Sequence, residues 1–280
     1  MTPAGRRTEN WLLLMHAALS SSVLLLSLSA FATGCSRKAD NPAPPAPPPP
    51  AADAGGAPSK TPPPPEPVAA GSIQGKVVYT GTEIPERTSL ANGTDPQICG
   101  QTMVKEDVVI SAQTRGIKNV LVWLEDVKLP EGYRPPPDHL VMDNVGCQFV
   151  PHAAVVTVGS TIEARSSDPV LHTTHLHGAA SENMPLPTKG SSATAKLRQL
   201  GLIKVLCDKH GWMEAFIRVD PHPYHAVTDA DGKFVIAGVP VGTYKLKVWH
   251  ERFSGQEQAV AVEAGKAAEL EIKYPTSQNQ

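Results

Sequence analysis

Three side chains that bind soft metal ions follow one another at three-residue intervals in the last third of the chain. Cys207, His210 and Met213 stand in the stretch VLCDKHGWMEAF. A thiolate and a thioether favour Cu(I), whereas an imidazole suits Cu(II). The same spacing is compatible with a buried thiol beside unrelated neighbours, and one thiolate with a thioether is a poor ligand set for structural zinc. A metal site therefore requires a further ligand from elsewhere in the chain.

The first 35 residues predict an exported, lipid-anchored protein. Arg6 and Arg7 precede an apolar run over residues 11–31, and small residues precede Cys35, which is the plan of a secretory signal. This end resembles a bacterial lipobox, with Ala32 where leucine is usual, and implies that Cys35 becomes the lipidated N-terminus; an uncleaved membrane anchor is the alternative. Residues 36–70 follow. Because 13 of the chain's 28 prolines lie between positions 41 and 70, we expect this segment to be a disordered Pro-rich linker.

The cysteine count separates Cys207 from the other thiols. If Cys35 carries a lipid, three of the four cysteines remain. In an oxidising compartment an odd number suggests one disulfide and one special thiol. Cys207 has the ligand-like neighbours, so we expect Cys99 to pair with Cys147. This pair would stabilise the fold by about 4 kcal/mol by constraining the unfolded chain.

Short apolar segments after Ala70 predict an all-β fold. They are rich in β-branched residues, are separated by Gly, Pro, Asp and Asn, and show no helical period. The predicted strands are 72–79, 119–125, 152–159, 161–165, 202–207, 215–219, 233–238, 243–250, 257–263 and 268–274.

The C-terminal segment, residues 222–280, resembles the carboxypeptidase regulatory-like, transthyretin-like β-sandwich family. The motifs TDADGKF and VPVGTY carry this resemblance. The opening strands of that family are missing here, but segments 72–78 and 119–125 match them. We therefore predict that residues 71–136 complete this sandwich and that residues 137–221 form an inserted second domain. Two independent small domains in a row are the alternative.

The inserted segment resembles the cupredoxins, the family of plastocyanin and amicyanin. It contains an aromatic-x-Pro approach at 149–151, a turn at 158–161 and then His172, in the order typical of that family. The resemblance implies a Greek-key β-sandwich over residues 137–221 that holds one type-1 copper ion. The implied metal ligands are His172, Cys207, His210 and Met213. The residue after the first histidine, an asparagine that braces the ligand loop in the family, is Thr173 here.

Several other residues could contact the copper site. A four-ligand site does not need His175 and His177. Either His175 lies beside the ligands or on the surface and His177 lies in solvent, or the two form an accessory copper site. Trp212 is either an apolar lid over the metal or an exposed docking residue. His222 and His250 are structural, or approach the copper loop if the sandwiches pack together, in which case His250 could hydrogen-bond across the interface.

These patterns predict a membrane-tethered periplasmic or cell-surface type-1 copper protein that transfers single electrons to an unknown redox partner protein. In the resembled family the electron leaves through the exposed edge of the loop histidine, here His210. The alternatives are a copper carrier or buffer, and an envelope-structural or adhesive lipoprotein without metal. No catalytic triad, carboxylate pair or phosphate loop stands out, so we expect neither an enzyme nor a small-molecule substrate. With a formal net charge of −2, nucleic acid is not an expected partner.

Overall fold

The computed structural model describes residues 69–275, so the predicted signal segment, Cys35 and nearly all of the Pro-rich linker lie outside the described residues. Strands dominate this part of the chain, and its one helix, α1 (Pro96–Cys99), has four residues. All ten segments predicted as strands form strands, which confirms the all-β fold class. No helix in this range has both the length and the apolar character needed to cross a membrane.

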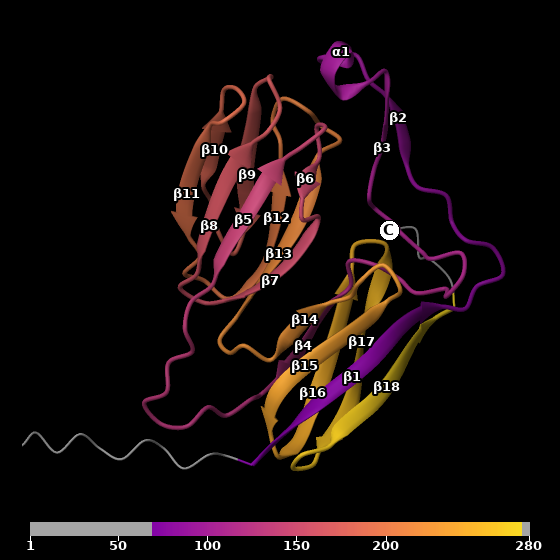
Figure 1. Ribbon diagram of the computed structural model, residues 1–280, viewed down its shortest axis with the longest axis vertical. Helices are drawn as coiled ribbons and strands as arrows, with labels where there is room; N and C mark the ends of the chain where they lie inside the picture. Colours follow the sequence, from indigo (N-terminus) through magenta and orange to yellow (C-terminus); the bar gives the residue numbers. More distant parts are fainter. Residues whose placement is uncertain (1–68, 276–280) are drawn as a thin grey trace, which may run out of the picture. The chain divides into compact units, whose positions relative to one another are not determined.

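One β-sandwich is assembled from both ends of the described chain. Its two sheets have the strand orders β15-β1-β18 and β14-β4-β16-β17. Strand β1, drawn in indigo, is antiparallel to β15 on one side and parallel to β18 on the other (Figure 1). The N-terminal segment therefore supplies strands to a sandwich built mainly from the C-terminal segment. The bounds are β1 (Ala70–Tyr79), β4 (Leu121–Glu125), β14 (His225–Val227), β15 (Lys233–Pro240), β16 (Gly242–His250), β17 (Phe253–Val262) and β18 (Ala267–Tyr274).

The TDADGKF motif closes a tight turn in this sandwich. The Asp229 carboxylate accepts the backbone N–H groups of Asp231 and Lys233 at 2.9 Å. Gly232 adopts a left-handed φ of 76°, and a Cβ there would lie 2.3 Å from the Val77 carbonyl oxygen. The glycine is thus required both by the backbone conformation and by the close approach of β1.

The second sandwich is formed by the middle of the chain. Its sheets have the orders β10-β9-β12-β13-β7 and β11-β8-β5-β6, with β5–β8 and β7–β13 as parallel neighbours (Figure 1). Alternate residues of each strand face the space between the sheets, as Ile162 and Ala164 of β8 and Ile203 and Val205 of β12 do. The bounds are β5 (His139–Asn144), β6 (Phe149–Val150), β7 (Ala153–Thr157), β8 (Thr161–Ser166), β9 (His172–Gly178), β10 (Asn183–Leu186), β11 (Ser192–Lys196), β12 (Gly201–Leu206) and β13 (Glu214–Asp220).

A small excursion between β1 and β4 was not expected from the sequence. Strands β2 (Ser89–Ala91) and β3 (Thr102–Val104) pair as a two-stranded sheet, with α1 between them. We call residues 89–104 the cap hairpin. The Asn92 side chain organises it, because its amide donates to the Gly100 carbonyl at 2.7 Å and accepts the Thr94 N–H at 2.7 Å. Cys99, at the end of α1, connects the cap hairpin to the second sandwich through a disulfide.

Candidate metal centre

The loop between β12 and β13 presents three potential ligands. Cys207, His210 and Met213 are all buried, with exposed fractions of 3%, 0% and 2%. Two backbone hydrogen bonds close the loop into a compact turn. The Met213 N–H donates to the His210 carbonyl at 2.9 Å, and the Cys207 N–H donates to the Met213 carbonyl at 3.3 Å. These bonds set the thiol and the loop imidazole on the same side of the turn.

The alternation of β9 places His172 beside this loop. His172, Thr174 and Leu176 point inward, whereas Thr173, His175 and His177 point outward. His172 is fully buried, and the register of β9 against β12 pairs His175 with Leu206, the last residue before Cys207. The first histidine therefore approaches the thiol from the neighbouring strand.

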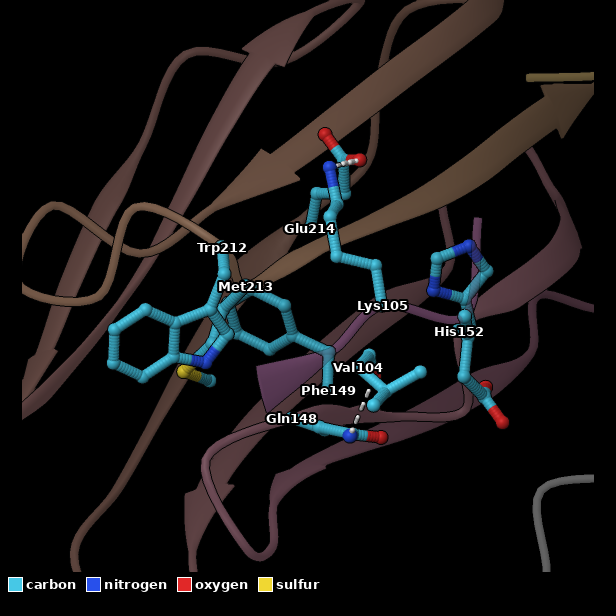
Figure 2. A pocket seen from close by; sticks show the side chains of 9 residues that line it. Val104, Lys105, Gln148, Phe149, His152, Trp212, Met213 and Glu214 are labelled. Atoms are coloured by element: carbon cyan, nitrogen blue, oxygen red, sulfur yellow. Dashed lines mark hydrogen bonds and ion pairs between the residues drawn. The ribbon is translucent and has the colours of Figure 1, made fainter. Parts of the chain in front are cut away.

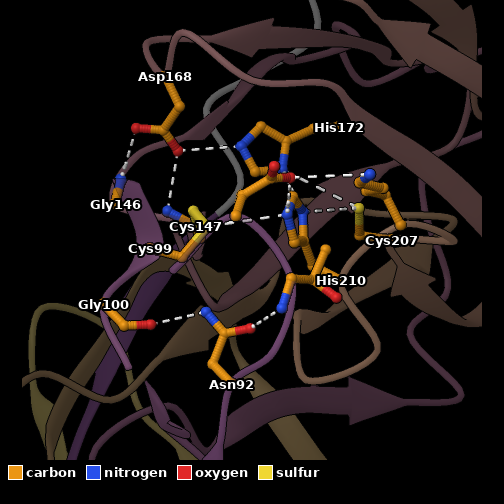
Figure 3. Close-up of a disulfide and its surroundings, with 12 residues drawn as sticks. Asn92, Cys99, Gly100, Gly146, Cys147, Asp168, His172, Cys207 and His210 are labelled. Atoms are coloured by element: carbon orange, nitrogen blue, oxygen red, sulfur yellow. Dashed lines mark hydrogen bonds and ion pairs between the residues drawn. A yellow bond between two sulfur atoms is a disulfide. The ribbon is translucent and has the colours of Figure 1, made fainter. Parts of the chain in front are cut away.

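The donor atoms of the three side chains converge. The Nδ1 atoms of His172 and His210 lie 3.1 Å apart, and the Cys207 Sγ lies 3.7 Å from the His210 Nδ1 and 4.0 Å from the His172 Nδ1 (Figure 3). Two imidazole nitrogens and a thiol sulfur at these separations fit a single trigonal metal position, the His₂Cys set of blue copper sites.

Two carboxylates determine which ring nitrogens face the centre. Asp168 Oδ2 lies 3.0 Å from the Nε2 of His172, and Asp95 Oδ2 lies 3.1 Å from the Nε2 of His210. An ionised carboxylate only accepts, so each Nε2 carries the proton and each Nδ1 of a neutral ring presents its lone pair. Two lone pairs facing each other at 3.1 Å repel unless a cation lies between them. The arrangement therefore fits a bound metal ion.

Burial favours the neutral rings that a metal requires. Desolvation lowers the pKa of His172, and the neighbouring His210 lowers it further, against the opposing effect of Asp168. Desolvation likewise lowers the pKa of His210, against the opposing effect of Asp95. Both imidazoles are thus held as neutral ligands near pH 7.

Thr173 braces the ligand loop in place of the asparagine of the resembled family. Its hydroxyl accepts the Asp208 N–H at 2.7 Å, and its own N–H points at the Cys207 Sγ at 3.4 Å. This N–H is positioned to orient the sulfur toward the two imidazoles. The departure from the family pattern therefore leaves the loop tied to β9.

Met213 and Trp212 close one side of the site. Met213 shares a buried cluster with Cys207, and the half-buried Trp212 packs against that cluster. The Trp212 indole centroid lies 5.0 Å from the His210 ring, and its Nε1 donates to the Cys147 carbonyl at 3.0 Å. This is the position expected of a lid.

A small pocket lies on the outer side of Trp212 and Met213. Figure 2 shows both side chains in its wall, together with Lys105 in an ion pair with Glu214. Its volume is about 20 Å³, which is room for roughly one water molecule. The pocket is therefore a packing feature beside the site.

The cap hairpin covers the edge of His210 that the sequence analysis expected to be exposed. His210 is fully buried, because its Nε2 meets Asp95 at 3.1 Å and the Cys99 Sγ at 3.7 Å. The expectation that electrons leave through an exposed edge of this ring is therefore wrong. It failed because the segment that covers the ring lies more than 100 residues earlier in the chain.

Cys99 and Cys147 are joined by a disulfide beside the ligands (Figure 3). Asp168 is bound to the same loop, since its carboxylate accepts the N–H of Gly146 at 2.9 Å and that of Cys147 at 2.8 Å. The disulfide and Asp168 together hold the cap hairpin and the loop before β6 near the two ligand rings.

The remaining candidate histidines lie away from the three converging donors. His175 and His177 stack on the outer face of β9 with centroids 4.0 Å apart, and the His175 Nδ1 bonds Asp208 at 2.9 Å. His222 is buried beside Tyr224, whose N–H its Nδ1 accepts at 3.3 Å, and burial lowers its pKa. None of them shares a metal-binding group with Cys207 in the described range.

Of the two interpretations of His250, the structure does not show the alternative hydrogen bond across the interface. Its Nδ1 accepts the Arg252 N–H at 3.1 Å within its own hairpin, and its buried Nε2 has no partner in the part of the chain that the structure describes. Contacts between the sandwiches include the bond of His152 to Glu251, the Phe216–Trp249 ring pair at 4.9 Å and an apolar cluster around Leu121 and Trp123.

The comparison with protein families finds a match in the last third of the chain. The carboxypeptidase regulatory-like domain family matches residues 214–274, a range that begins in β13 of the second sandwich. No curated protein matches the chain. The matched range contains β13 of the second sandwich and strands β14 to β18 of the first.

Solved structures that match part of this chain include a copper enzyme and cupredoxins. They include a copper-containing nitrite reductase (NirK) from Thermus scotoductus SA-01, with 21% identity over 34% of this chain and 25% of that chain and a TM-score of 0.27. A purple cupredoxin from Nitrosopumilus maritimus has 18% identity over 29% of this chain and 99% of that chain, with a TM-score of 0.26. A reduced amicyanin variant has 17% identity over 35% and 98% of the two chains, with a TM-score of 0.27. The chain spans a quarter of the nitrite reductase, and at this similarity the function must be argued from the site.

Sequence reasoning missed two residues that surround the ligands, Asp95 and Asp168, and it predicted Cys99 only as a disulfide partner. Asp95 and Asp168 bind the outer nitrogens of the two rings, and Cys99 contacts His210 through its sulfur. Asp168 lies four residues before His172, a local spacing that could have been noticed. Asp95 carries no such signal, because nothing in its neighbourhood distinguishes it from an ordinary turn aspartate.

Proposed function

We propose that this protein binds one copper ion through His172, Cys207, His210 and Met213, and that it transfers single electrons. The observation that carries the proposal is the convergence of two Nδ1 atoms and one Sγ within 3.1–4.0 Å in a buried pocket. When bound, copper supplies a one-electron redox couple. The protein residues hold the ligands in one arrangement, exclude water and keep both rings neutral, so that either oxidation state is accommodated with little movement.

We further propose an exported lipoprotein that is tethered through Cys35, with a redox partner protein that contacts the domain. Sequence features alone support the tether. The proposal includes no catalysis, because four protein ligands leave no open coordination position for a substrate. Partition of the mature protein into the aqueous phase of a detergent extraction, without a lipid mass on Cys35, would rule out the tether.

Addition of Cu(II) to the mature, metal-free chain tests the copper site. We expect one equivalent to bind and to produce an intense visible band from thiolate-to-copper charge transfer, which a mild reductant bleaches reversibly. Absence of copper binding would contradict the proposal and would favour the envelope-structural or adhesive alternative. In that case the sandwich built from both ends of the described chain would act only as a scaffold.

A copper carrier is the second candidate function. Two observations favour it: the His210 ring is sealed by the cap hairpin, and His175 and His177 stack on an outer strand face where they could receive an ion. Colourless binding of more than one equivalent of Cu(I), with slow or absent reoxidation, would support the carrier over electron transfer.

A further inference from the structure

Both ligand imidazoles are anchored from behind by carboxylates that lie outside the ligand loop. We propose that Asp95 and Asp168 are positioning residues of the metal site, and that together they bias it toward the oxidised ion. This inference rests on the proposed copper site. It concerns residues that neither the ligand motif nor the loop spacing includes.

Asp168 acts on the ring of His172. It is buried, with 7% of its surface exposed, and its Oδ2 lies 3.0 Å from the His172 Nε2. The same carboxylate accepts the N–H groups of Gly146 and Cys147, so its orientation is fixed by two further bonds. Gly146 and Cys147 both have left-handed backbones, with φ values of 58° and 57°, which turn their N–H groups toward one point. The carboxylate thus cannot rotate away from the ring without losing these bonds.

Asp95 acts on the ring of His210 from the cap hairpin. Its Oδ2 lies 3.1 Å from the His210 Nε2, and its side chain makes no capping bond to α1. Its carbonyl oxygen accepts the Cys99 N–H at 2.9 Å. Since Cys99 is bonded to Cys147, the disulfide ties the backbone of Asp95 to the sandwich that carries His210. The Cys99–Cys147 disulfide therefore helps to hold the Asp95 carboxylate beside the His210 ring.

The pairing has a chemical consequence for the metal. A carboxylate that accepts the Nε2 proton fixes the ring tautomer with Nδ1 as ligand and makes the imidazole a stronger donor. Two such carboxylates also add negative charge beside a buried site, although Lys209, at 3.9 Å from the Asp95 Oδ2, offsets part of the charge of Asp95. Both effects stabilise Cu(II) more than Cu(I). Removal of either carboxylate should raise the reduction potential.

Nuclear magnetic resonance of the metal-free chain tests the positioning role without copper. In the wild type, we expect long-range proton–nitrogen spectra to show the Nε2-protonated tautomer for both rings, with slowly exchanging Nε2 protons. Asp95→Asn should lose this signature at His210 alone, and Asp168→Asn at His172 alone. Glu269→Gln, which removes one negative charge from the exposed face of β18, is the matched control and should change neither ring. An Nδ1-protonated ring in the wild type, or unchanged rings in both variants, would overturn the inference.

Voltammetry of the copper-loaded chain tests the electronic role. We expect each Asp→Asn variant to weaken Cu(II) binding relative to Cu(I) by about tenfold, which for one electron raises the potential by about 59 mV. Glu269→Gln should leave the potential unchanged. Potentials of Asp95→Asn and Asp168→Asn equal to that of the wild type would overturn the bias toward the oxidised ion. Near-ultraviolet circular dichroism must show that each variant is folded.

The two readouts separate this inference from the proposed function. If no copper binds but the ring tautomers respond as expected, the proposed function fails and the positioning of the rings stands. If copper binds and the band forms while neither tautomers nor potential respond, the proposed function stands and the roles of Asp95 and Asp168 are wrong.

Discussion

At the scale of single residues, the candidate site depends on the orientation of a few polar atoms. Cys207 supplies the sulfur, and His172 and His210 turn their Nδ1 atoms toward it. Thr173 contacts both the sulfur and the loop backbone, a task that the resembled family gives to an asparagine. Thr173 thus contacts Cys207, Asp168 contacts His172 and Asp95 contacts His210, and none of these three neighbours is itself a ligand.

Cys207→Ser should abolish the visible band of the copper-loaded protein while the fold remains. The hydroxyl cannot provide the charge-transfer sulfur, and serine is close to cysteine in size, so the buried position stays filled. Absorption spectroscopy after addition of Cu(II) checks the band, and near-ultraviolet circular dichroism checks the fold. A folded serine variant that keeps the intense band would show that Cys207 is not the ligand.

Met213→Gln should keep the band and lower the reduction potential, because the axial ligand tunes the couple. Met184, which is buried at 5% exposure on β10, provides the matched control. Met184→Gln introduces the same amide into the same core and should lower stability without a comparable shift in potential. Voltammetry of both variants is the measurement, and an unchanged potential in Met213→Gln would show that Met213 is not axial.

At the scale of elements, the cap hairpin changes how the site meets its surroundings. It places Asp95 and the Cys99–Cys147 disulfide against His210, so the ring edge that a partner would touch is covered. A redox partner would have to face the cap hairpin or another side of the sandwich. The outward face of β9, with its stacked His175 and His177, is the neighbouring polar surface.

Replacement of both Cys99 and Cys147 by serine should lower the free energy of unfolding by about 4 kcal/mol, because the cross-link joins positions 48 residues apart and restricts the unfolded chain. The double variant avoids a stray thiol near the site. Guanidinium denaturation of both proteins gives the difference, and carbethoxylation of His210 should become faster as the cap hairpin loosens. A loss below about 1 kcal/mol, with His210 still protected, would contradict this account.

At the scale of the whole described molecule, both ends of the chain form one sandwich and the middle of the chain forms the other. Strand β4 pairs with β16, so Leu124 lies opposite Leu246 across the insertion. Polar groups lie in and near the contact between the two sandwiches, among them the buried His152 and His250 and the partly buried Glu251. Such groups make the stability of the molecule depend on pH.

Acidification should destabilise the protein through His250. Burial lowers the pKa of His250 to about 3 from an ordinary value of 6.5, with a further lowering by His152 and Arg252 and opposing effects of the Lys118 backbone and of Asp107. Between about pH 3 and pH 6.5, His250 is therefore protonated in the unfolded chain and neutral in the folded chain. Stability is unaffected above about pH 6.5 and falls by about 1.4 kcal/mol per pH unit between that value and about pH 3.

The variant His250→Phe isolates this effect, because it keeps an aromatic ring beside Phe253 and cannot take up a proton. Chemical denaturation at pH 7 and pH 5 should show that the wild type loses about 2 kcal/mol more than the variant over this interval. Equal losses in the two proteins would mean that His250 does not titrate as its burial requires.

The sequence by itself determined the all-β class, ten strand segments and the local loop that carries Cys207, His210 and Met213. These follow from short-range patterns: alternation of apolar residues, turn residues and a fixed ligand spacing. Polar strands such as β9, with seven residues, and β11 escaped notice because HTTHLHG and SATAK lack a clear apolar period. Their assignment required neighbouring strands to pair with.

Only the tertiary structure decided how the candidate site is enclosed. The contact between Asp95 and His210 joins residues 115 positions apart, and a single aspartate in a turn has no pattern that points to a distant ring. The burial of His210, the path of the cap hairpin and the convergence of the Nδ1 atoms with Sγ arise from packing between segments. Residue spacing could name candidate ligands, but which of their edges face solvent depends on the segments that fold over them.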